Sequence, residues 1–159
     1  MTTTTSHLPY RSGVGIMLLN KRGLVFVAKR IDMTSEAWQM PQGGIDDGES
    51  PEVCAKRELE EETGVKDATI IAESKDWLTY DLPSELVPKL WKGQYRGQKQ
   101  KWYVMLLKGG DELINIHTEE PEFSEWKWAK AHTLPDLIVP FKRDMYQALV
   151  DEFKEFVSD

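Results

Sequence analysis

The sequence predicts an α/β fold in which a mixed β-sheet is sandwiched between α-helices. Short apolar runs typical of strands are interspersed with segments of helical spacing, without the regular strand–helix–strand repeat of a parallel sheet. The chain has 159 residues, of which 40% are hydrophobic and 30% charged, as expected for one globular domain. We expect residues 1–8 to be a flexible tail and residues 9–159 to form that single domain.

The first predicted elements form a hairpin. Residues 13–19 suit a buried strand, residues 20–23 have the composition of a turn, and residues 24–28 suit the returning strand. Gly23 is expected to adopt a positive φ in that turn. Residues 38–48 are rich in glycine and are expected to be a loop.

A helix is predicted over residues 51–63. Ser50 is a favourable N-cap, Pro51 suits the first helical position, and Glu52 faces the positive end of the helix dipole. Gly64 is a typical C-terminal stop. Local signals therefore define both ends of this helix.

Three further strands and a closing helix are expected. The strands are residues 68–72, 102–107 and 123–128, and the second is apolar enough to be covered on both faces. From residue 141 onward, apolar residues recur at helical spacing, which predicts an amphipathic helix. These residues are Met145, Leu149, Phe153 and Phe156.

Composition argues against several classes of protein. The single cysteine, Cys54, excludes an internal disulfide, and its small side chain is expected to pack in the core. The lack of disulfides favours a reducing, cytoplasmic location for the protein. No apolar stretch approaches the roughly 20 residues of a membrane-spanning helix, so no membrane partner is expected. The net charge of −7 argues against bulk nucleic-acid binding, and DNA is not expected as a partner. The oligomeric state is left open.

The charges are unevenly distributed along the chain. Residues 46–62 hold eight acidic and two basic residues, whereas residues 86–110 hold six basic residues and no acidic one. Trp91 and Tyr95 in the basic segment add rings on which bases could stack. This pattern indicates a site that handles metal cations and phosphates together.

Three glutamates share one side of the predicted helix. Glu58, Glu61 and Glu62 are spaced i, i+3 and i+4, so their like charges repel and folding gains nothing from them. Mg²⁺ or Mn²⁺, which prefer oxygen ligands, would compensate three carboxylates. Arg57 can orient Glu61, and Glu49 can brace Arg57. The alternative is a solvated acidic helix face.

Residues 43–65 resemble the Nudix box at every defined position. The resemblance implies a mixed sheet between helices and hydrolysis of a nucleoside diphosphate linked to another group, dependent on Mg²⁺, for which Mn²⁺ can substitute. The roles that it implies are metal binding by Gly43, Glu58, Glu61 and Glu62 and bracing by Arg57 and Glu49.

A further family carboxylate corresponds to Glu122, which lies in a different segment. The resemblance implies that it binds metal or accepts the proton of the attacking water, and the alternative is a surface glutamate. The general base is left open among Glu58, Glu62 and Glu122.

Beyond the box, the chain resembles the bacterial RNA pyrophosphohydrolases and the asymmetric dinucleoside tetraphosphate hydrolases of plants and bacteria. Residues 38–44, 97–102 and 141–143 carry this likeness, whereas Ser12 departs from it. It implies removal of pyrophosphate from the 5′ end of triphosphorylated RNA, together with hydrolysis of dinucleoside polyphosphates. A dedicated dinucleoside tetraphosphate hydrolase and a non-catalytic nucleotide-sensing module are the alternatives, and the intact glutamate set argues against the second.

The resemblance also implies contacts with the phosphates and first nucleotides of the substrate. Gln98 and Lys99 are expected to be exposed, whereas Trp102 is expected in the core. Phe141 either flanks a base or anchors the core. The residues implied in substrate binding are Arg11, Arg30, Gln42, Gln98, Lys99, Val139, Phe141 and Lys142.

Overall fold

The computed structural model describes residues 7–32 and 36–158 and contains one seven-stranded sheet. The strands are β1 (Tyr10–Leu19), β2 (Val25–Arg30), β3 (Gln42–Gly44), β4 (Ala68–Glu73), β5 (Leu78–Asp81), β6 (Gly97–Leu107) and β7 (Phe123–Ala129), and the helices are α1 (Pro51–Thr63), α2 (Leu134–Leu137) and α3 (Arg143–Glu152). The strand order is β4-β6-β1-β2-β7, with β3 also paired to β1 and β5 to β6. Because β1 and β6 are parallel while their other neighbours are antiparallel, the sheet is mixed, as predicted.

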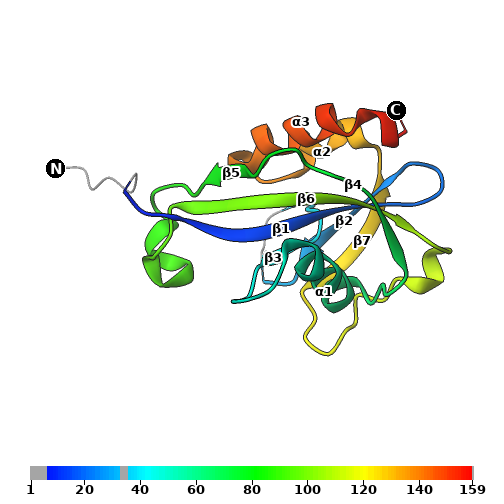
Figure 1. Cartoon of the computed structure of the whole chain (residues 1–159), viewed down its shortest axis with the longest axis horizontal. Helices are drawn as coiled ribbons and strands as arrows, with labels where there is room; N and C mark the ends of the chain where they lie inside the picture. Colours follow the sequence, from blue (N-terminus) through cyan, green and yellow to red (C-terminus); the bar gives the residue numbers. More distant parts are fainter. Residues whose placement is uncertain (1–6, 33–35, 159) are drawn as a thin grey trace.

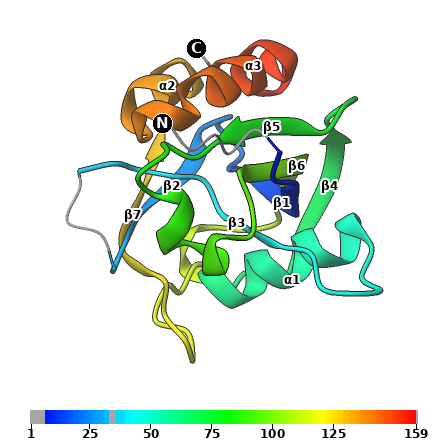
Figure 2. The same cartoon turned by 90° about the vertical axis from the view of Figure 1, so that its left-hand side faces the viewer.

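The helices cover the sheet from both sides. Figures 1 and 2 show α1 on one face and α2 with α3 on the other. Side chains of β1 alternate between these faces: Val14, Ile16 and Leu18 belong to the buried cluster under α1. Met17 and Leu19 belong to the cluster under α3. The predicted sandwich of a mixed sheet between helices is confirmed.

The local signals around α1 act as expected. Ser50 Oγ accepts a hydrogen bond from the Val53 backbone N–H over 3.2 Å. Gly64 has φ 74° and donates its N–H to the Glu60 carbonyl over 2.8 Å. The helix therefore occupies residues 51–63, as predicted, and its carboxyl end is fixed beside the loop that precedes β7 (Figure 1).

The predicted hairpin and strands are also confirmed. Leu19 pairs with Val25 across the turn, in which Gly23 has φ 76°. The expected strands at 68–72, 102–107 and 123–128 correspond to β4, β6 and β7, but β6 begins at Gly97, five residues before its predicted start.

The expected loop at 38–48 is wrong at its centre, where Gln42–Gly44 form β3 antiparallel to β1. Two of the three residues of β3 are glycines, which are not typical of strands, so composition did not predict it. Their backbone groups can nevertheless pair with β1. The closing helix is shorter than expected: α3 ends at Glu152 and a 3₁₀ turn, Lys154–Phe156, follows. The short elements β5 and α2 were not predicted.

Residues 1–6 of the predicted tail lie outside the described residues, and Leu8 packs against the cluster under α3. Within 7–32 and 36–158, every helix is too short or too polar to cross a membrane.

Candidate active site

The glutamate face of α1 follows from the way in which the helix packs. Cys54, Ala55 and Leu59 are buried against the sheet. Glu58 and Glu62 lie beside this apolar stripe, with side-chain exposure of 14% for Glu58 and residue exposure of 4% for Glu62. Packing of the helix therefore forces two carboxylates into poorly solvated positions, which is costly unless something cationic balances them.

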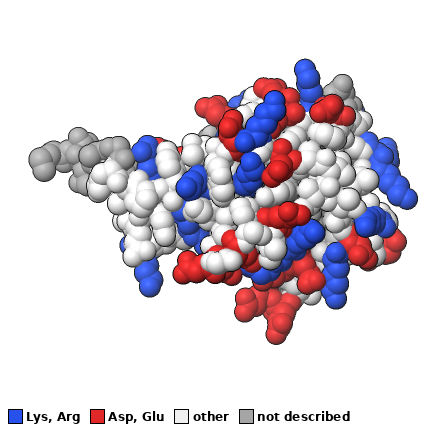
Figure 3. All heavy atoms as spheres, viewed as in Figure 1, with Lys and Arg blue, Asp and Glu red and all other residues white. Residues whose placement is uncertain are grey.

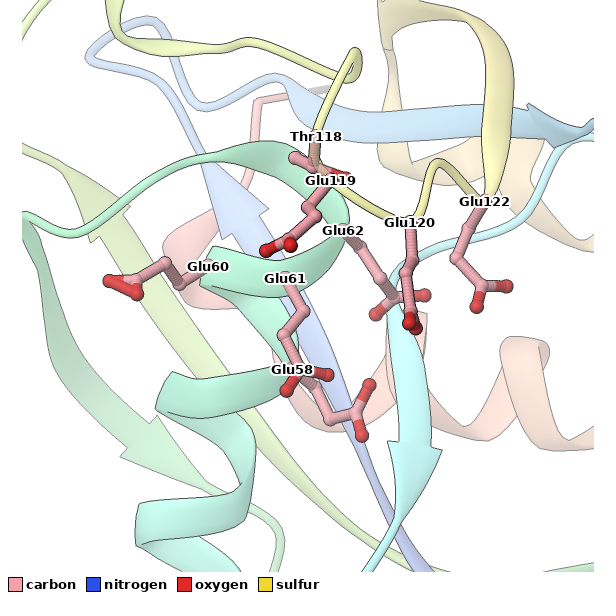
Figure 4. A pocket seen from close by; sticks show the side chains of 8 residues that line it. All are labelled: Glu58, Glu60, Glu61, Glu62, Thr118, Glu119, Glu120 and Glu122. Carbon is pink, nitrogen blue, oxygen red and sulfur yellow. The ribbon is translucent and has the colours of Figure 1, made fainter.

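These carboxylates line a cavity of about 450 Å³. One wall comes from α1 and the other from the loop before β7 (Figure 4). Figure 4 shows Glu62, Glu120 and Glu122 directed toward one another, whereas Glu60 turns away. In Figure 3, acidic side chains are spread over the visible face, and one group of them lies at the bottom of the view, where Figure 1 draws α1 and the loop before β7. The lining residues are Glu58, Glu60, Glu61, Glu62, Thr118, Glu119, Glu120 and Glu122.

Arg57 is hydrogen-bonded to two of the glutamates that line this cavity. Its Nε and Nη2 donate to both carboxylate oxygens of Glu49, at 2.7 and 2.9 Å. Its Nη1 donates to Glu58 Oε1 at 2.9 Å and to Glu61 at 3.2 Å. The hydrogen bonds from Arg57 lower the pKa of Glu49 to about 2. The expected bracing of Arg57 by Glu49, and of Glu61 by Arg57, is therefore present as geometry.

Burial gives two of the carboxylates unusual proton affinities. It raises the pKa of Glu58 to about 7, in spite of the opposing Arg57 guanidinium. Burial, with the charges of Glu58 and Glu122, raises the pKa of Glu62 well above its ordinary value. Burial also raises the pKa of the Cys54 thiol to about 12, which fits the expected packing role of this residue.

The residues around the cavity fit a divalent cation held by oxygen ligands. Glu62 Oε2 and Thr118 Oγ1 are buried and find no hydrogen-bond partner in the described part of the chain. A Cβ at Gly43 would overlap the carboxylate of Glu58, so glycine leaves the space that this carboxylate occupies. Because all the available donors are oxygens, the set suits Mg²⁺ or Mn²⁺ better than zinc. Across residues 7–32 and 36–158, no three acidic, histidine or cysteine side chains are already grouped so that they could hold a metal ion.

A second group of predicted residues meets on the other side of β3. Lys142 is 7% exposed, and its Nζ donates to Gln42 Oε1 over 3.3 Å and lies 4.8 Å from the centre of the Tyr80 ring. Burial, reinforced by the Arg30 guanidinium, lowers the pKa of Lys142 to about 8. Gln98 belongs to the same group, and its exposure of 1% shows that the expectation of an exposed side chain was wrong.

The other basic residues that were predicted to contact substrate each lie beside a different partner. Arg30 forms a two-bond pair with Asp32, at 2.9 and 2.6 Å. Arg11 lies 5.2 Å from the centre of the Trp91 ring. Lys99 lies over Trp77, because successive side chains of β6 point to opposite faces. The structure therefore does not bring Lys99 together with Gln98.

Phe141 packs beside Tyr80. Its ring lies 5.8 Å from that of Tyr80, and both Phe141 and Val139 are half-buried against the cluster under α3. The two readings of Phe141, core anchor and wall of a base site, are thus compatible in one position.

Sequence reasoning missed several residues of the site. Glu119 and Glu120 line the cavity, and the acidic run that continues to Glu122 was an available signal. Gln100 joins Gln98 to Gln42, but both Gln98 and Gln100 precede the strand that was predicted at 102–107, so the sequence carried no signal for this link. By contrast, two cations of the basic segment are held by other groups: Arg96 pairs with Asp81 at 2.7 Å, and Lys99 lies over Trp77.

A carboxylate-lined cavity on a loop–helix–loop, beside a basic and amide-rich wall, defines a hydrolase site of the phosphoanhydride-cleaving kind. The chain belongs to the Nudix family, because the model of the NUDIX domain matches residues 9–149.

Individual proteins that are similar to this chain in sequence or in structure add to the family assignment. The chain is 58% identical over 151 residues to the RNA pyrophosphohydrolase of Roseobacter denitrificans, covering 94% of each chain. Among solved structures, it resembles the dihydroneopterin triphosphate pyrophosphohydrolase of E. coli, with a TM-score of 0.68, 18% identity and coverage of 91% and 99%. It also resembles an Ap4A hydrolase of C. elegans, with a TM-score of 0.67, 18% identity and coverage of 92% and 99%. The two structural likenesses establish the fold.

Proposed function

We propose that this chain is a metal-dependent RNA 5′ pyrophosphohydrolase that removes pyrophosphate from triphosphorylated RNA and also hydrolyses dinucleoside polyphosphates. The observation that carries this function is the glutamate face of α1, on which Glu62 is buried and Glu58 nearly so, combined with 58% identity to an RNA pyrophosphohydrolase. A nucleotide sensor would not need these repelling carboxylates, since they contribute nothing to folding. A cytoplasmic location, where such RNA is made in bacteria, accompanies this proposal.

Nudix hydrolases generally need a divalent metal, and for this chain we assign Mg²⁺, with Mn²⁺ as a substitute. When bound, the cation supplies charge neutralisation at phosphate oxygens and lowers the pKa of bound water. Glu58, Glu61 and Glu62 would hold it, with Glu122 and the Gly43 backbone carbonyl as further oxygen donors. Arg57 keeps Glu58 and Glu61 on the cavity side of α1.

The remaining chemistry is positioning and proton transfer. Glu58, Glu62 and Glu122 are the candidates for taking the proton of the attacking water. Lys142, Gln42 and Gln98 would hold the phosphate chain. Arg11 and Arg30 are the additional cations for the phosphates, while Val139 and Phe141 would flank a base.

The lowered pKa of Lys142 predicts a pH dependence. The ammonium is charged below about pH 8 and neutral above it, so attraction for a polyphosphate weakens as the pH rises through that value. We therefore expect kcat/KM, which reports on the free enzyme, to decline above about pH 8. In the Lys142→Arg variant the cation stays charged, and the decline should move to a higher pH. Superimposable profiles of the two proteins above pH 8 would contradict this role of Lys142.

The substrate assignment is tested by comparing specificity constants. Triphosphorylated RNA, diphosphorylated RNA and diadenosine tetraphosphate are assayed side by side with the same enzyme and Mg²⁺. We expect kcat/KM to be at least about tenfold higher for the RNA substrates than for the dinucleotide, because RNA adds contacts beyond the phosphates. A preference for diadenosine tetraphosphate would instead identify a dedicated dinucleoside tetraphosphate hydrolase, and absence of turnover on all three would leave a binding module.

A further inference from the structure

A column of polar side chains lies inside the sheet, on the face covered by α3. Gln98, Gln100 and Trp102 follow one another at two-residue spacing in β6, and their exposures are 1%, 0% and 0%. Trp102 Nε1 donates to Gln100 Oε1 over 3.1 Å. Buried amides are expensive unless each polar atom is satisfied, so the direction of every hydrogen bond here has consequences.

The indole fixes the orientation of the Gln100 amide. An indole N–H can only donate, so the atom of Gln100 that faces it must be the oxygen. The Gln100 Nε2 group then faces the opposite way. It donates to Gln98 Oε1 over 2.6 Å and to Gln42 Oε1 over 2.8 Å, which uses both of its hydrogens.

This arrangement sets the amides of Gln42 and Gln98 in turn. Both use their oxygen toward Gln100, and Gln42 Oε1 also accepts from Lys142 Nζ. Since oxygen and nitrogen occupy opposite corners of an amide, both Nε2 groups are directed away from Gln100. An anion can only accept hydrogen bonds, so a phosphate on the far side of these amides would meet N–H groups, whereas flipped amides would offer it repelling oxygens.

We propose that Gln100 is a positioning residue which, locked by Trp102, holds Gln42 and Gln98 with their N–H groups toward the phosphate chain. The proposal rests on the proposed function, because it takes a polyphosphate as the ligand of Gln42 and Gln98. Gln100 itself makes no contact with substrate. Its effect is transmitted through the two amides that it orients.

The test compares Gln100→Met with a matched control. Methionine is similar in size and flexible, but it lacks the amide that orients Gln42 and Gln98. The control is Gln39→Met, because Gln39 is also buried, at 8% exposure, and lies outside this hydrogen-bonded group. The probe is inorganic triphosphate with Mg²⁺, measured by calorimetry. We expect the dissociation constant to rise about tenfold in Gln100→Met, as for the loss of one ordered hydrogen bond, and to stay unchanged in Gln39→Met.

Non-additivity separates positioning from a general structural role. If Gln100 acts through Gln42 and Gln98, adding Gln100→Met to a Gln42→Met/Gln98→Met double variant should not weaken triphosphate binding further. With RNA substrate, Gln100→Met should raise KM about tenfold and leave kcat within about twofold, since the phosphate contacts exist in both ground and transition states. An undiminished loss in the triple variant, or a fall in kcat alone, would overturn the proposal.

Trp102→Phe is the second variant, for the case that Gln100→Met does not fold. It keeps the ring but removes the N–H that fixes the Gln100 amide, so it should also weaken triphosphate binding. Unchanged binding in the folded variant contradicts the proposal. Two measurements keep the two proposals apart. If the wild type releases no pyrophosphate from RNA, the proposed substrate is refuted. The positioning role of Gln100 is decided by the triphosphate-binding data alone.

Discussion

The Glu62→Gln variant is expected to lose about 10³-fold in kcat while its fold stays intact. A cation at the phosphates contributes several kcal/mol to the transition state, and about 1.4 kcal/mol corresponds to a factor of ten in rate. Glutamine has the same shape as glutamate but cannot supply the charge of the buried Oε2, the oxygen that finds no hydrogen-bond partner among the described residues. Initial rates on triphosphorylated RNA at saturating Mg²⁺ measure this effect.

Stability should respond in the opposite sense. The raised pKa of Glu62 shows that its charged form is unfavourable in the folded protein, next to Glu58 and Glu122. A neutral amide should therefore leave the free energy of unfolding unchanged or raise it, as thermal unfolding without metal can show. Glu52→Gln is the matched control, because this exposed glutamate of the same helix does not line the cavity and should keep normal kcat. Near-normal turnover by Glu62→Gln would exclude Glu62 from the metal site.

Removal of divalent cations is expected to abolish turnover completely and reversibly. Without a cation, the carboxylates that line the cavity face the phosphates of the substrate and repel them. Addition of excess Mg²⁺ or Mn²⁺ after a chelator should restore the original rate. The measurement is pyrophosphate release from RNA before chelation, after it, and after readdition.

A stability assay provides the control for this experiment. A cation that binds the folded state raises the unfolding temperature. Mg²⁺ should therefore stabilise the wild type but have a much smaller effect on Glu62→Gln. Turnover that persists in the presence of a chelator, with the chelator shown to strip the protein, would contradict the mechanism.

The sequence predicts those parts of the molecule that depend on local signals. The ends of α1 are set by Ser50 and Gly64, and both were readable without a structure. The glutamate face follows from helical periodicity alone. Strand β3 was not readable, because its glycines carry no β-propensity and it exists only through pairing with β1.

The glutamine side chains at the start of β6 show more clearly what the sequence could not predict. The composition of β6 suggested exposed polar residues at its start, yet Gln98 is buried and Lys99 is not. Burial was decided by the alternation of the strand together with the covering α3, and by a hydrogen-bonded partner, Gln100, that satisfies the amide. Such long-range satisfaction of polar groups cannot be deduced from composition, because it depends on which strands become neighbours.

The most direct test of the account is the location of Mn²⁺ by anomalous diffraction in crystals grown with inorganic triphosphate. The account predicts an anomalous peak between the carboxylates of Glu58, Glu61 and Glu62, with triphosphate oxygens completing the coordination. Full occupancy of triphosphate in the cavity with those three side chains turned to solvent, and no anomalous peak beside them, would contradict it.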